Sequence, residues 1–157
     1  MAAGATYEPI ASVTSTGQTT ISFNSIPQTY TDLVLIGNGA YSGTTYGSFK
    51  FNNVTGSTSY TRFLGYSTTT LSDGSGVSDG FSLGATRGQV IANIQNYSST
   101  SIQKIMLLRE NAHVDGLGVY VYLWRNTAAI TQIDITAKAS GTFISGSMFT
   151  LYGIKAA

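Results

Sequence analysis

Seven carboxylates and one histidine supply the acid–base chemistry available to this sequence. The carboxylates are Glu8, Asp32, Asp73, Asp79, Glu110, Asp115 and Asp134. A glycosidase needs two carboxylates that face each other across a cleft, and nothing in the spacing of these residues favours such a pair. Each is more naturally a turn residue, a charge at a strand edge or a salt-bridge partner. We therefore expect no catalytic carboxylate.

His113 lies in the polar stretch 110–116, which we expect to be a turn. No serine lies in a Gly-x-Ser-x-Gly elbow that leads into a helix, as the nucleophile of an α/β-hydrolase does. A tetrahedral zinc site needs four ligands, and a chain with one histidine and no cysteine cannot fill one from these residue types. The sequence predicts a non-enzymatic protein with no catalytic residue, no metal site and no cofactor.

The triplet Ser-Asp-Gly occurs at residues 72–74 and again at 78–80. A calcium loop needs alternating oxygen donors and usually a closing bidentate carboxylate, and neither is present here. The whole stretch Ser67–Gly84 is rich in Ser, Thr, Gly and Asp and has no strong strand pattern. We interpret it as a surface loop whose role stays open.

Four tyrosines fall in or beside expected loops, where their rings could stack on a sugar. They are Tyr41, Tyr46, Tyr60 and Tyr66. The alternative is that these rings pack the loops or face a neighbouring subunit, where tyrosine is enriched. The pattern leaves open both a host-surface carbohydrate and a protein as their partner.

The composition is that of a single β-rich domain spanning residues 1–157. Only 10% of the residues are charged and the net charge is +1, whereas a typical soluble domain has about 25% charged residues. Near-zero net charge argues against nucleic acid as a partner, and such a low charge density favours self-association. The sequence shows no signal peptide and no run of about 20 apolar residues, so we expect no membrane insertion.

The segment Leu117–Asn126 has the pattern of a strand in the middle of a sheet. One face carries Val119, Val121 and Leu123, and the other carries Tyr120, Tyr122 and Trp124. Both faces are bulky and apolar, so one should enter the core and the other needs cover. We expect the aromatic face to meet a second layer, a loop or another subunit, because a row of exposed aromatic residues is unusual.

Met148–Ile154 has the same two-sided character, with Phe149 and Leu151 alternating with Met148, Thr150, Tyr152 and Ile154. A two-layer sandwich buries only one face of each sheet. We therefore predict a homotrimer whose contact includes Tyr120, Tyr122 or Trp124, or else the face of Phe149 and Leu151. Cover by a loop of the same chain is the alternative.

Short apolar or alternating runs recur along the whole chain, with no amphipathic helix of useful length. This spacing predicts about nine to ten strands in an all-β fold, a β-sandwich of jelly-roll type.

Two stretches carry a resemblance to a known group of proteins. They are Ile26–Leu35, preceded by Ile21-Ser22-Phe23, and the C-terminal Gly146–Ala157. Between them, Phe51-Asn52 and Leu123-Trp124-Arg125 fall in the expected order. Together they resemble small virion proteins of tailed bacteriophages, many from phages of cyanobacteria and marine bacteria, and a module at the C-terminal end of longer tail proteins.

The resemblance implies a β-sandwich or jelly-roll unit on the virion surface, commonly trimeric, that acts as capsid cement or as a fibre head. The strand pattern already begins near Thr6, which leaves no room for an anchoring domain and a stalk. We therefore expect a capsid decoration protein that binds the major capsid protein and is made in the cytoplasm of the bacterial host. The alternative is a receptor-binding tail-fibre head that holds host glycan through its loop tyrosines.

Overall fold

The computed structural model describes residues 6–43, 46–54, 60–66, 71–75, 79–84, 87–113 and 116–155, and their side chains except at 60–80, 112–113 and 116–117. The described residues form twelve strands in two antiparallel sheets, with no helix among them. The predicted all-β sandwich is confirmed, although it has more strands than the nine to ten expected.

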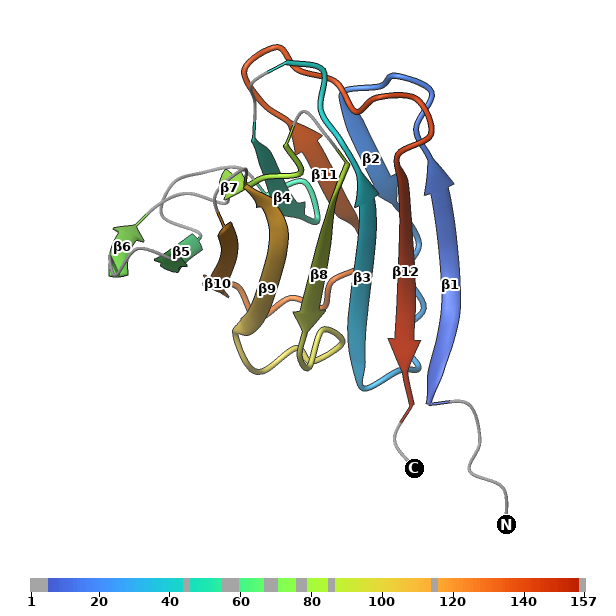
Figure 1. The fold of residues 1–157 in the computed structure, drawn as a ribbon. Coiled ribbons are helices and arrows are strands. Elements are labelled where there is room, and N and C mark those ends of the chain that lie inside the picture. The colour runs from blue at the N-terminus through green and yellow to red at the C-terminus, as the bar shows by residue number, and fades with distance from the viewer. Residues whose placement is uncertain are drawn as a thin grey trace.

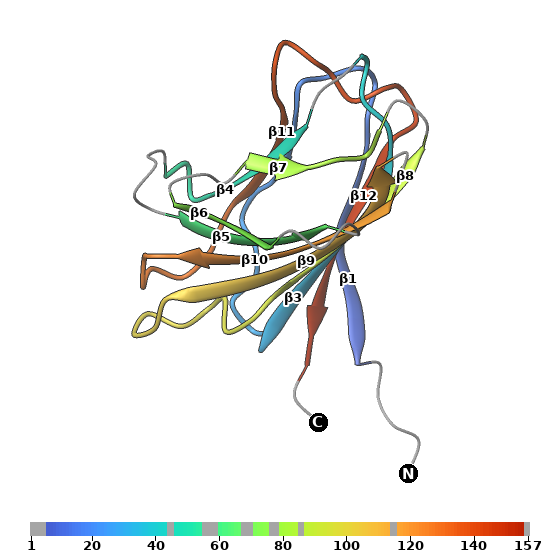
Figure 2. The ribbon, with the colours of Figure 1, turned by 60° about the vertical axis from the view of Figure 1, so that its left-hand side comes forward.

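The larger sheet has eight strands, and its β1 side lies far from the β5–β6 hairpin (Figure 1). Its order is β1 (Tyr7–Thr14), β12 (Met148–Ile154), β3 (Asp32–Gly39), β8 (Gly88–Ile94), β9 (Lys104–His113), β10 (Gly116–Trp124), β5 (Tyr60–Tyr66) and β6 (Leu71–Ser75). The smaller sheet has the order β2 (Thr20–Phe23), β11 (Ile133–Ala137), β4 (Gly47–Phe51) and β7 (Asp79–Phe81). It forms a second layer over part of the larger sheet (Figure 2).

The strand pairing has the form of one long antiparallel ribbon folded over on itself. β1 pairs with β12, β2 with β11, β3 with β8 and β4 with β7. Two more pairings, β12 with β3 and β11 with β4, close the ribbon into the two sheets. The hairpins β5–β6 and β9–β10 are insertions in this ribbon, and both extend the larger sheet.

The interpretation of Ser67–Gly84 as a loop without strands is wrong at two places. Residues 71–75 form β6 and residues 79–81 form β7. Their Ser, Gly and Asp content gives no intrinsic preference for a strand, so it is pairing with β5 and β4 that places them in the sheets. Pro9 lies in β1, which is an edge strand, and the register shifts between Pro9 and Ala11, as is typical of a proline in a sheet.

The two stretches that carry the resemblance to phage virion proteins, Ile26–Leu35 and the C-terminal stretch that begins at Gly146, meet at one corner of the sandwich. β3 pairs with β12, which places the end of the first stretch beside the second. The Tyr30 ring lies over Gly153, where an added Cβ would be 2.3 Å from the ring carbon Cγ. Asp32 accepts the backbone N–H of Asn96 at 2.7 Å at this corner. The stretches therefore specify a packed corner of the fold.

Side chains cross-link the loops at the same end of the sandwich. Asn52 Oδ1 accepts the N–H groups of Thr131 and Gln132, and its Nδ2 donates to Ala129 O at 2.7 Å. The buried Tyr97 donates its hydroxyl to the carbonyl of Pro27. These bonds supply partners for backbone groups that no strand pairing satisfies.

Both ends of the described chain leave the sandwich at the same place (Figure 1). Tyr7 and Ile154 are direct partners in the β1–β12 pairing. Beside them, Lys155 Nζ lies 2.6 Å from Glu8 Oε1, and the Tyr30 hydroxyl donates to Glu8 Oε2 at 3.2 Å. The Lys155 hydrogen bond is the main reason that the pKa of Glu8 lies below its usual value.

Candidate functional site

The residues predicted to form a subunit contact lie in the core instead. The side chains of Tyr120, Tyr122, Trp124, Phe149 and Leu151 are at most 1% exposed. The smaller sheet covers them, so the subunit contact predicted through these side chains is wrong and cover by the chain's own second layer is correct. Large rings are needed to fill the gap of about 10 Å between two packed sheets.

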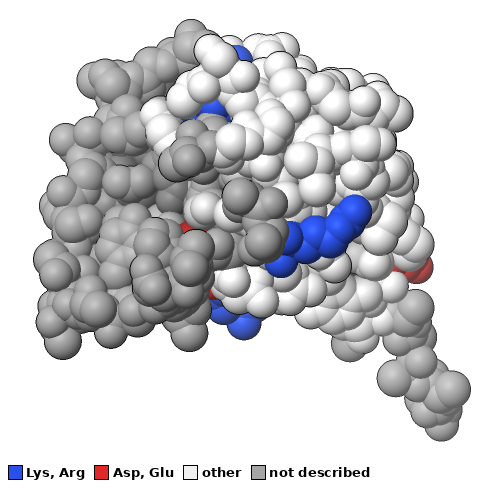
Figure 3. Space-filling model, turned by 45° about the horizontal axis from the view of Figure 1, so that its top comes forward, with Lys and Arg blue, Asp and Glu red and all other residues white. Residues whose placement is uncertain are grey.

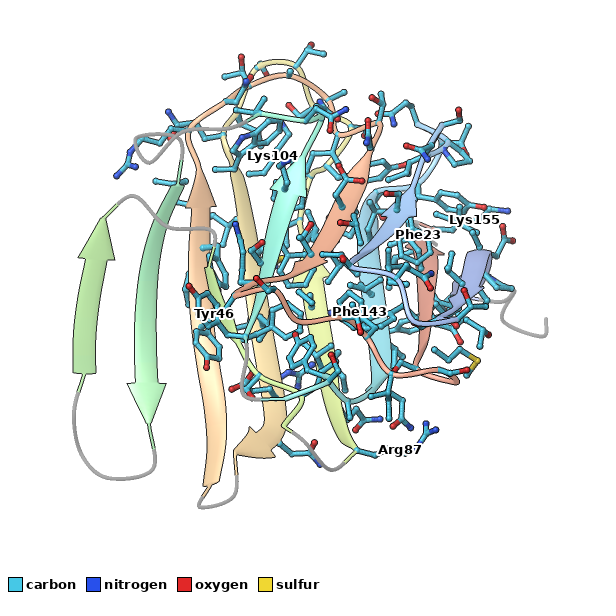
Figure 4. The ribbon with its side chains drawn as sticks, turned by 90° about the horizontal axis from the view of Figure 1, so that it is seen from above. Phe23, Tyr46, Arg87, Lys104, Phe143 and Lys155 are labelled. Carbon is cyan, nitrogen blue, oxygen red and sulfur yellow. The ribbon has the colours of Figure 1, made fainter. Side chains whose placement is uncertain are left out.

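Ring contacts between the sheets show how this core is built. Trp124 of β10 meets Phe51 of β4 edge-on, with ring centroids 5.4 Å apart. Phe149 of β12 meets Phe143 in the same manner at 5.1 Å. Figure 4 shows Phe23 and Phe143 among the side chains that fill the space between the layers. These rings determine which face of each strand points inward.

Glu110 holds the inward tyrosine face of β10 in place. This buried carboxylate accepts the hydroxyl of Tyr120 at 2.7 Å and also the backbone N–H of Ser82. Buried polar groups are costly unless they are hydrogen-bonded. Glu110 therefore links β9, β10 and the segment after β7 through its hydrogen bonds.

Lys104 is a buried cation at the opposite end of β9 (Figure 4). Its Nζ donates to Ile102 O at 2.7 Å and Thr127 O at 2.9 Å, and it lies 5.9 Å from the centre of the Trp124 ring. Burial lowers the pKa of this ammonium group. These contacts tie the segments that precede β9 and follow β10 to the core.

The four loop tyrosines fall into different environments. Tyr41 is 1% exposed and packs against Phe143 at 5.3 Å between centroids, so its ring cannot stack on a sugar. Burial also raises the pKa of its hydroxyl. Tyr46 is 43% exposed. Tyr60 and Tyr66 are the first and last residues of β5, and their side chains lie outside the described ones.

The outward face of the larger sheet carries a group of exposed apolar side chains on β9 and β10. Ile105, Leu107 and Val121 are 46%, 39% and 38% exposed, respectively. Val121 is the direct partner of Leu107, and the neighbouring Leu123 is the partner of Ile105. We call these four residues the outer row. Sequence reasoning missed it because it assigned the valine face of β10 to the core.

A shallow pocket of about 260 Å³ lies beside the outer row. Its lining residues are Gln89, Ile91, Arg109, Glu110, Asn111, Gly118 and Val119. Arg109 is exposed and donates from Nη2 to Asn93 Oδ1 at 3.1 Å. The N–H of Gln89 donates to Asn111 Oδ1 at 2.7 Å. One cation and several amides thus surround a floor of aliphatic side chains.

The acidic residues and the histidine do not form a cluster among the described side chains. Among the described side chains, no three His, Cys, Asp or Glu residues come together as a metal site. The side chains of Asp73, Asp79, His113 and Asp115 lie outside the described set. The letters Gly-x-Ser-x-Gly occur at residues 76–80, but Asp79 begins strand β7 where a nucleophile elbow would begin a helix.

On the face shown in Figure 3, the described residues are mostly uncharged, with few lysines and arginines among them. No helix long and apolar enough to cross a membrane occurs in the described ranges. Comparison of the chain with protein-family models, with curated proteins and with solved structures gave no match. The candidate site consists of the outer row and the adjoining pocket.

Proposed function

We propose that this protein is a non-enzymatic structural protein of a bacteriophage virion, a capsid decoration protein that binds the shell through the outer row. The observation that carries the proposal is the row itself. Its apolar side chains project from the middle of a sheet and not from a loop. Exposed apolar patches on a soluble domain mark interaction surfaces, and a sheet holds such a patch rigidly.

The fold supports the proposal through its connectivity. We propose that the folded ribbon of β1, β2, β3, β4, β7, β8, β11 and β12 is a jelly roll, an eight-stranded double sheet of the kind found in viral capsid and lectin domains. The order of its strands in the two sheets supports this assignment. Fold alone does not define function. The proposal therefore also draws on the resemblance of Ile26–Leu35 and Gly146–Ala157 to virion proteins of tailed phages.

We also propose that the protein acts as a homotrimer on the virion surface. The trimer contact must use exposed residues, because the five aromatic and aliphatic candidates from the sequence are in the core. The low proportion of charged residues, 10%, supports self-association. Sedimentation of the wild-type protein tests this proposal, and a monomer at high micromolar concentration contradicts it.

Receptor binding by loop tyrosines has less support. Of the four tyrosines, only Tyr46 has a described exposed ring, and a single aromatic side chain provides a small platform for a sugar. A glycan array probed with the wild-type protein and with Tyr46→Ala would support this alternative if binding were strong and lost in the variant.

The decisive experiment is to locate the protein on intact virions by electron microscopy. We expect density on the shell, with the outer row facing the major capsid protein. Shells that lack the protein should break at a lower temperature and regain stability when wild-type protein is added. Density confined to the tail, or unchanged shell stability, would contradict the decoration role.

A further inference from the structure

Arg109 is an exposed cation that makes no ion pair with any carboxylate among the described side chains. It lies on the outward face of β9, two residues after Leu107, and is the direct partner of Val119 on one side and Ile91 on the other. Its described hydrogen bond is to the neutral amide of Asn93 at 3.1 Å. A guanidinium has five N–H donors, so most of them remain available to a ligand.

The surroundings of Arg109 favour a carboxylate that is attached to an apolar group. Ile91 and Val119 flank the arginine, and Gln89 and Asn111 also line the pocket. Glu110 lines the pocket too, but its carboxylate is hydrogen-bonded to Tyr120 on the inward face. Arginine binds carboxylates through two parallel hydrogen bonds, and the outer row adds an apolar surface next to that contact.

A second copy of this chain is a poor occupant for this surface. In a two-fold contact through the pocket the two Arg109 side chains would approach each other, and like charges oppose such pairing. The described carboxylates are already bonded. Glu8 pairs with Lys155, Asp32 accepts the N–H of Asn96, and Glu110 and Asp134 are buried. None of these described carboxylates is free to pair with Arg109, which favours another protein as the source of the complementary charge.

We propose that the pocket at Arg109 and the adjoining outer row bind a protein partner through an acidic side chain flanked by apolar residues. The carboxylate pairs with the Arg109 guanidinium, and the flanking residues pack on Leu107 and Val121. This inference rests on the proposed function in one respect, namely that the partner is a protein of the virion shell.

The first experiment uses small probes and the wild-type protein labelled with ¹⁵N. Isovalerate joins a carboxylate to a branched aliphatic group, and isovaleramide has the same shape without the charge. We expect isovalerate to shift the Nε–H resonance of Arg109 at millimolar concentrations and isovaleramide to leave it in place. Glucuronate tests an acidic sugar as the alternative source of the carboxylate.

The second experiment measures binding to shells that lack the protein. Arg109→Gln should weaken binding by about tenfold or more, since it removes a charge-assisted pair. Arg109→Lys should restore part of the loss, because it keeps the charge but not the paired donors. Arg87→Gln is the matched control, because Arg87 is an exposed arginine that contacts Gly146 O outside the pocket.

The outcomes separate the inference from the proposed function. Equal binding of the wild type and Arg109→Gln to shells overturns the inference and leaves the decoration role standing. A wild type that does not bind shells, but whose Arg109 responds to isovalerate, overturns the decoration role and supports the carboxylate site. No response to isovalerate, or a response to glucuronate alone, overturns the acidic protein partner.

Discussion

The two faces of β10 are both apolar, but one is buried in the core and the other is exposed. Tyr120, Tyr122 and Trp124 are at most 1% exposed, whereas the alternate residue Val121 is 38% exposed. The difference is one of size: the aromatic rings reach across to Phe51 and the smaller sheet, and the valines are too short to do so. Volume, and not hydrophobicity, determines the inward face of this strand.

The comparison also assigns different consequences to substitutions on the two faces. A change on the inward face removes packing or buries a polar group, so it acts on the folded state. A change on the outward face leaves the core unchanged, so it acts on whatever the outer row binds. Adjacent residues of one strand provide matched pairs for testing this division.

The largest effect is expected for Tyr122→Asp. An unpaired carboxylate in the core costs several kcal/mol, which is a large fraction of the stability of a small domain, so the variant should be unfolded by circular dichroism. Val121→Asp, one residue earlier on the outward face, should remain folded. A folded Tyr122→Asp protein that sediments as a monomer would show that this face is a subunit contact after all.

A smaller difference is expected between neighbours on β12. Phe149→Ala should lower the free energy of unfolding by about 3–5 kcal/mol, because it leaves a cavity beside Phe143. Met148 is 49% exposed, and Met148→Ala should change the same quantity by less than about 1 kcal/mol. Urea titration of both variants measures the difference, and equal losses would argue against the orientation of β12.

Substitution by glutamine at two adjacent charged residues of β9 compares an inward side chain, Glu110, with an outward one, Arg109. Glu110→Gln should cost about 1–3 kcal/mol of unfolding free energy, because one of the two donors that meet the carboxylate would face an amide N–H₂ group. Arg109→Gln should change stability by less than about 0.5 kcal/mol. Thermal unfolding of both variants is the measurement, and similar melting temperatures would contradict the structural role of Glu110.

The smallest effect on stability is expected for the ion pair of Glu8 and Lys155, beside the ends of β1 and β12. The pKa of Glu8 is lowered in the folded protein, so its contribution is present above the unfolded pKa and is lost as the pH falls through the folded pKa. Wild type should melt slightly above Glu8→Gln at pH 7, and the gap should close in acid. A gap that widens as the pH falls would have the wrong sign.

Sequence patterns are sufficient to predict most strands of the sandwich, with β6 and β7 as exceptions, but not the orientation of the strands. Alternation in Leu117–Asn126 and Met148–Ile154 predicts strands with two apolar faces, and only the position of the smaller sheet decides which face is buried. Glycine and serine residues around Tyr41 favour a loop. The isolated β-bridge between Tyr41 and Phe143 instead places the tyrosine ring in the core.

The outer pocket was beyond sequence reasoning for a related reason. Gln89 and Asn111 lie on strands β8 and β9, and Val119 lies on β10. Their proximity depends on the register of three strands, which local patterns do not specify. Arg109 alone in a strand pattern suggests only an exposed charge, and its role depends on the aliphatic neighbours that the register supplies.

The pairing of Tyr7 with Ile154 places the start of the first strand of the sandwich beside the end of the last, so the ends of the domain could lie at another turn without a change in the strand pairing. A few residues could bridge this seam and turn the chain into a closed loop, which could then be opened at any surface turn without breaking a strand pair. Domains whose ends meet in this way tolerate circular permutation and insertion into other chains. The sandwich could therefore be joined to a carrier protein at this single place, and such a fusion would leave the outer row exposed.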